Sequence, residues 1–103
     1  SGDNTVECIE QSIKEVANDD NADDYFVIAL SDANLARYHI TPEALGHALK
    51  SNDKVKSAVI FIDKGPEAMQ AAQILRGRAF VAQNTRDIPR ILSDILTSMV
   101  AGQ

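Results

Sequence analysis

The sequence has one cysteine and no tryptophan, and aromatic residues make up only 5% of its 103 residues. A single cysteine, Cys8, excludes an internal disulfide and any zinc site built from several cysteines, and it suits a reducing compartment. The longest apolar run, Tyr25–Leu30, is too short to cross a membrane. The first residues lack the cationic segment and apolar core of a signal peptide. These absences predict an intracellular protein without membrane contact.

A second hydrophobic core is also missing. At this length, folding buries roughly 65% of the surface of the extended chain, which is enough for one core. The chain is 45% hydrophobic and 24% charged, as in ordinary globular domains. No internal repeat or low-complexity segment divides it. We therefore expect residues 1–103 to form a single domain.

Basic residues are scarce at the beginning of the chain. Residues 1–32 contain nine acids and one base, a net charge of −8, whereas residues 33–103 contain six acids and nine bases, a net charge of +3. The whole chain carries −5. Proteins that bind nucleic acid draw much of their affinity from cations that neutralise phosphates, so the composition predicts no nucleic-acid partner.

Helical and strand patterns alternate along the chain. Apolar residues recur at helical spacing near 5–17, 42–50, 66–76 and 88–100, and Thr41 with Pro42 forms a typical helix start. Gly77 is expected to end the third helix. Short apolar runs at 25–30, 57–62 and 79–83 are expected to form strands, and the last run, shorter and less apolar, suits an edge position.

This alternation is typical of the α/β class. It predicts three layers: a mostly parallel, three-stranded sheet with helices on both faces. The carboxyl ends of parallel strands lie at one edge, where Asp32, Asp63 and Thr85 are expected to gather. One functional hypothesis is therefore a small-ligand or nucleotide-binding domain that uses this edge.

Enzyme signatures are absent from the sequence. It contains no phosphate-binding glycine loop and no nucleophile elbow. His39 and His47 lack partners at zinc-ligand spacing and are expected to face solvent. Cys8 flanks the apolar stripe of the first helix and is expected to pack as a small side chain. We therefore predict no catalytic residue and no enzymatic activity for this segment.

Two oxygen-bearing residues are the candidate metal ligands. Asp32 directly follows a buried strand, and Thr5 begins the first helix. Each has a structural alternative, because an aspartate can cap the next turn and a threonine can cap a helix. Together they could also supply a carboxylate and a hydroxyl to Mg²⁺, which prefers a few oxygen ligands and retained water.

The pattern of these segments resembles the C-terminal half of a von Willebrand factor A domain. The resemblance rests on Gly2–Thr5 before an amphipathic helix, Ser31–Asn34 after a buried strand, the strand 58–62 and the final helix from Asp87. It implies a partial doubly wound, Rossmann-like sheet and a metal-ion-dependent adhesion site for Mg²⁺. Thr5 matches the family's threonine ligand and Asp32 its aspartate ligand. The Asp-x-Ser-x-Ser loop of the family has no match here, so the resemblance places the remaining ligands outside this chain.

The same resemblance implies a biological setting. The segment 23–38 is most similar to a member whose long chain resembles AAA-type ATPases and is regarded as mitochondrial. Any ATP binding or ATPase activity would belong to that parent chain. The resemblance therefore implies an interaction module whose metal-site edge receives a protein partner, with weak or no Mg²⁺ binding in the isolated chain.

The family's strand order also has a consequence for the strand Tyr25–Leu30. In the order 3-2-1-4-5-6 this strand would be central, with neighbours on both sides. Without the preceding strands, one of its edges exposes unpaired backbone amides and carbonyls. We expect self-association through this strand, or cover by the first helix.

Overall fold

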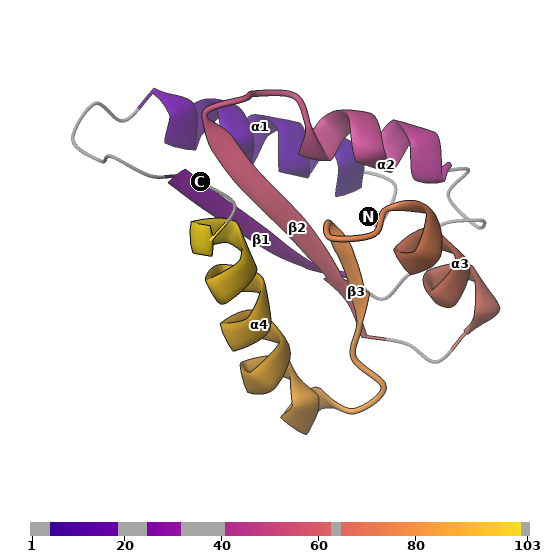
Figure 1. The fold of residues 1–103 in the computed structure, drawn as a ribbon. Coiled ribbons are helices and arrows are strands. Elements are labelled where there is room, and N and C mark those ends of the chain that lie inside the picture. Colours follow the sequence, from indigo (N-terminus) through magenta and orange to yellow (C-terminus); the bar gives the residue numbers. More distant parts are fainter. Residues whose placement is uncertain (1–4, 19–24, 32–40, 63–64, 102–103) are drawn as a thin grey trace.

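The computed structural model describes residues 5–18, 25–31, 41–62 and 65–101. The elements alternate as the sequence predicts (Figure 1). In chain order they are α1 (Thr5–Ala17), β1 (Tyr25–Ser31), α2 (Pro42–Leu49), β2 (Val55–Phe61), α3 (Pro66–Ile74), β3 (Ala79–Val81), a 3₁₀ turn η2 (Thr85–Asp87) and α4 (Ile88–Ala101).

Local sequence signals set several of these boundaries. The Thr41 hydroxyl accepts a hydrogen bond from the Ala44 amide at 3.0 Å, and Pro42 occupies the first turn of α2, where its missing amide costs nothing. After α3, Gly77 adopts a φ of 86°, a left-handed conformation that residues with side chains rarely adopt. The chain can therefore turn sharply from α3 into β3.

The sheet is parallel throughout its described part. Its strand order is β1-β2-β3, so β2 is central and β3 lies at an edge, as the sequence predicted. Tyr25 pairs with Val55 at one end of the β1–β2 ladder, and Ser31 pairs with Phe61 at the other. We call the end of the sheet where the strands begin the amino edge and the end where they stop the carboxyl edge.

Helices cover both faces of the sheet, which confirms the three-layer α/β prediction. The first three helices pack on one face, and α4 packs alone on the other (Figure 1). Two parallel crossovers, β1-α2-β2 and β2-α3-β3, place α2 and α3 on the same side because each is right-handed. The face under the first three helices has a fully buried core that includes Leu45, Leu49, Val59 and Phe61.

Some local expectations are wrong. The second strand begins at Val55, earlier than predicted, and the third ends at Val81, before Ala82 and Gln83. Cys8 is exposed, because it lies one residue before the buried Ile9 and so about 100° around the helix from it. Leu96, expected within the apolar stripe of α4, is 41% exposed.

Candidate functional site

The carboxyl edge of the sheet is where the sequence places its candidate ligands. Because α1 runs antiparallel to β1, the beginning of α1 and the end of β1 lie toward the same end of the molecule (Figure 1). The helices α2, α3 and α4 also begin toward this edge, because each of them follows a strand that ends there. Their first amides give the edge a partial positive charge, which favours carboxylate side chains.

The two predicted ligands are placed differently. Thr5 is the first residue of α1, and only its backbone is described. Asp32 directly follows Ser31, the last residue of β1, and lies outside the described residues. The arrangement therefore brings the backbone position of Thr5 to the end of the sheet that precedes Asp32. A shared metal ion remains a prediction.

Other polar side chains near this edge have structural roles. The Asn84 side chain accepts a hydrogen bond from the Arg86 amide at 3.0 Å and so caps the turn η2. Thr85, from the small-ligand hypothesis, is exposed at the start of this turn, and Asp63 lies outside the described residues. Within the described residues, no group of three or more histidine, cysteine, aspartate or glutamate side chains is arranged to hold a metal ion.

His47 is exposed on α2, as the sequence predicted, while His39 lies outside the described residues. No described helix is long and apolar enough to span a membrane.

The outer edge of β1 is the second candidate for a functional surface. In the described part of the chain, β1 has a strand neighbour, β2, on one side only. Leu30 is 56% exposed, the largest value among the large hydrophobic side chains that the structure describes. It pairs with Ile60, which packs against α4, so Leu30 belongs to the face that α4 covers alone. An apolar side chain beside an open strand edge is typical of a surface that another chain segment covers.

Sequence comparison identifies a relative of the chain. Over 102 aligned positions the chain is 46% identical to von Willebrand factor A domain-containing protein 8 of Mus musculus. The chain is homologous to a segment of a von Willebrand factor A domain-containing protein. The alignment covers 95% of this chain but only 5% of the relative, so the chain spans a small part of that protein. No protein-family model matches the chain, and no solved structure matches it.

The homology supports the interpretation of the chain as a fragment of a von Willebrand factor A domain. The three-stranded parallel sheet agrees with part of a doubly wound architecture. The open edge of β1 is the feature that sequence reasoning had signalled, through the family's strand order. The exposure of Leu30 was not signalled, because Leu30 ends an apolar run that reads as wholly buried.

Proposed function

We propose that this chain is a protein-interaction module that forms the C-terminal part of a Mg²⁺-dependent von Willebrand factor A domain. The observation that carries the proposal is its 46% identity to a segment of a von Willebrand factor A domain-containing protein. In the proposal, further strands of the longer protein pair with the outer edge of β1 and complete the sheet. The open edge of β1 and the exposed Leu30 support this part of the proposal.

The proposed metal site lies at the carboxyl edge. Thr5 would contribute a hydroxyl and Asp32 a carboxylate, and both are hard oxygen donors of the kind that Mg²⁺ prefers. The common end of α1 and β1 supports this pairing. The remaining ligands would come from segments outside this chain, and a carboxylate of the partner protein would take the open coordination position. With so few of its oxygen ligands, the isolated chain should bind Mg²⁺ weakly or not at all.

A Mg²⁺ titration followed by NMR tests the metal site. The amides next to Thr5 and Asp32 should shift together with millimolar affinity or not at all, and Asp32→Ala should abolish any shift. Asp53→Ala is the matched control, because Asp53 is an exposed carboxylate at the amino edge. Micromolar affinity that survives Asp32→Ala would remove the metal site from the proposal.

The proposal assigns no enzymatic activity to this chain. ATP binding and hydrolysis would belong to the AAA-type parent chain, which the resemblance implies, and the same resemblance supports a mitochondrial location. A screen of nucleotides by NMR separates this proposal from the small-ligand hypothesis. We expect no nucleotide to shift amides at the carboxyl edge, whereas saturable shifts around Thr85 would favour the small-ligand hypothesis.

A further inference from the structure

The amino edge of the sheet carries a cationic groove that the proposed function does not use. It consists of two adjoining hollows, about 250 Å³ and about 240 Å³ in volume. Lys56 and Arg78 line both hollows. Arg76 adds a charge to the larger hollow, and Lys50 adds one to the smaller. We call this surface the cationic groove.

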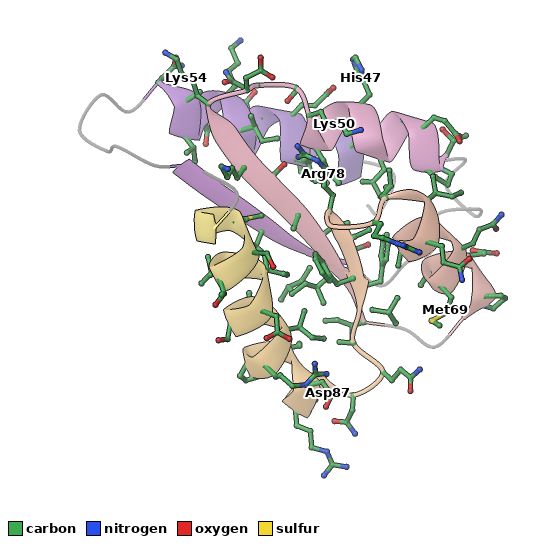
Figure 2. The ribbon with its side chains drawn as sticks, in the orientation of Figure 1. His47, Lys50, Lys54, Met69, Arg78 and Asp87 are labelled. Carbon is green, nitrogen blue, oxygen red and sulfur yellow. The ribbon has the colours of Figure 1, made fainter. Side chains whose placement is uncertain are left out.

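Three parts of the chain build the groove. Lys50 directly follows α2, Lys56 lies on β2, and Arg76 and Arg78 lie in the turn between α3 and β3. Figure 2 shows Lys50 and Arg78 on the same side of the molecule, away from Asp87 at the opposite end. Because Lys50 and Lys56 are distant in sequence from Arg76 and Arg78, the fold brings these two pairs together.

One of these cations is held in place. The Arg78 guanidinium donates a hydrogen bond from Nη1 to the Leu49 carbonyl at 3.1 Å, and the side chain is half-buried. Leu49 ends α2, so this bond fixes the guanidinium against the end of that helix. A fixed cation loses less conformational entropy when it binds an anion than a freely moving lysine does.

Negative groups near the groove offset part of its positive charge. The helices α2, α3 and α4 end at the amino edge, and each C-terminus carries about −0.5 of a charge. Asp53, at the smaller hollow, contributes one full negative charge. Of the full charges that line the two hollows, four are therefore cationic and one is anionic. Among the described residues, one ion pair is present, between Arg90 and Asp94, and it lies outside the groove. The cations of the groove therefore have no carboxylate partner in this part of the chain.

The shape of the groove and the charge of the rest of the chain narrow the class of ligand. Two adjoining hollows with shared cations suit an elongated ligand with several anionic groups better than one small anion. A nucleic acid would extend its phosphates beyond the groove, toward a chain with a net charge of −5 and −8 in residues 1–32. A short segment of polypeptide can place its carboxylates in the groove alone.

We propose that the cationic groove binds an extended acidic segment of a partner protein through Lys50, Lys56, Arg76 and Arg78. This interface lies at the opposite edge of the sheet from the proposed Mg²⁺ site, and it requires no metal. Met99 also lines the larger hollow, and its apolar side chain would contact the aliphatic parts of the bound side chains.

Fluorescence anisotropy tests this proposal with a labelled peptide in which glutamate alternates with serine. The measurement is made with EDTA present, so its result is independent of the Mg²⁺ site. A salt concentration of about 0.1 M limits electrostatic interactions to about 10 Å and so reduces repulsion from the acidic first third of the chain. We expect saturable binding that is lost at about 1 M salt, where the screening length is about 3 Å.

Charge reversal at the two exposed cations locates the site. Lys50→Glu with Arg76→Glu should weaken peptide binding at least about tenfold. Lys14→Glu with Arg86→Glu is the matched control, since both residues are exposed, lie outside the groove and give the same change in net charge. The control should change the affinity less than about twofold. Lys56→Gln provides a second test within the groove, because Lys56 lines both hollows. Circular dichroism checks that each variant folds.

Three results would overturn the proposal. The first is no binding of the acidic peptide at either salt concentration. The second is an equal loss of affinity in the groove variant and its control, which would indicate only a general charge effect. The third is tighter binding of inorganic tripolyphosphate or of a short oligonucleotide at the same residues, which would identify a phosphate site instead.

Discussion

The two faces of the sheet differ in how completely the chain covers them. Under α1, α2 and α3, the side chains of Leu45, Leu49, Val59 and Phe61 are 0% exposed. On the opposite face, α4 buries Ile60 and Ile95 but leaves Leu30 56% exposed. Among the residues that the structure describes, the first face is fully covered, whereas the second is open beside β1.

The difference follows from topology. Each right-handed crossover between neighbouring parallel strands adds a helix to the same face, so a sheet that grows in one direction receives its helices on one side. The opposite face receives a helix only where the chain leaves β3 and returns as α4 (Figure 1). A doubly wound sheet covers that second face by extending in the other direction, beyond β1. The closed face should therefore carry most of the stability, and the open face the interactions.

The largest expected effect compares two phenylalanines on opposite faces. Phe61 is fully buried on the closed face, whereas Phe80 is half-buried against α4. Phe61→Ala should lower the free energy of unfolding by about 3–5 kcal/mol, because it removes a large side chain and leaves a cavity. Phe80→Ala should cost about 1–2 kcal/mol, in proportion to its smaller buried area. Urea denaturation measures both, and equal losses would contradict the contrast between the faces.

The next effect concerns the hydrogen bonds that join α2 to the sheet. The Leu49 carbonyl accepts from the Ser57 hydroxyl at 2.5 Å and from the Arg78 guanidinium at 3.1 Å. Either Ser57→Ala or Arg78→Gln leaves this carbonyl one donor, so each alone should cost about 1 kcal/mol.

The double variant should be worse than the sum of the two. With both donors removed, a carbonyl of a buried residue is left unpaired, which costs about 1–3 kcal/mol more. A double-mutant cycle in urea measures this coupling. Additive losses would mean that water replaces the missing donors and that this part of the closed face is accessible to solvent.

Most of the fold could be predicted from the sequence because its elements carry strong local signals. The Thr41–Pro42 start and the period of Ile91 and Ile95 on α4 each depend on residues close together in the chain, whereas α3 ends at Ile74, before the stop expected at Gly77. The strand limits could not be predicted as well. Val55 pairs with Tyr25, so the start of β2 is set by its neighbour in the sheet and not by its own residues.

The candidate functional surfaces were less predictable, because they too depend on residues that are distant in the sequence. Thr5 and Asp32 could be proposed from their positions before a helix and after a strand, and from the family resemblance. The cationic groove could not, because Lys50, Arg76 and Arg78 are ordinary surface residues until the parallel sheet brings their connections together. A local sequence pattern does not show which distant segments become neighbours in the fold.

A smaller effect tests how closely α2 and α3 pack on the closed face. A Cβ added at Gly46 would lie 2.8 Å from the Leu75 Cδ2 atom, so Leu75 must move in Gly46→Ala. Alanine favours the helix by about 1 kcal/mol over glycine, and this gain should roughly offset the repacking of Leu75. In a Leu75→Ala background the clash is absent, so the same change should stabilise by about 1 kcal/mol. Thermal or urea unfolding of the four proteins measures the difference, and no coupling would show that the helices separate readily.

The smallest effect on stability should accompany the clearest effect on association. Leu30→Lys places a charge on an exposed side chain beside the open edge of β1, and it should change the free energy of unfolding by less than about 0.5 kcal/mol. Because a lysine at a strand edge opposes pairing with another chain, concentration-dependent self-association should decrease. Ile74→Lys is the matched control: Ile74 is 50% exposed, but it lies on α3, away from that edge. Analytical ultracentrifugation over a concentration series compares the three proteins. A monomeric wild-type chain, or an equal loss of association in both variants, would contradict the role of the open face as the surface through which this chain meets others.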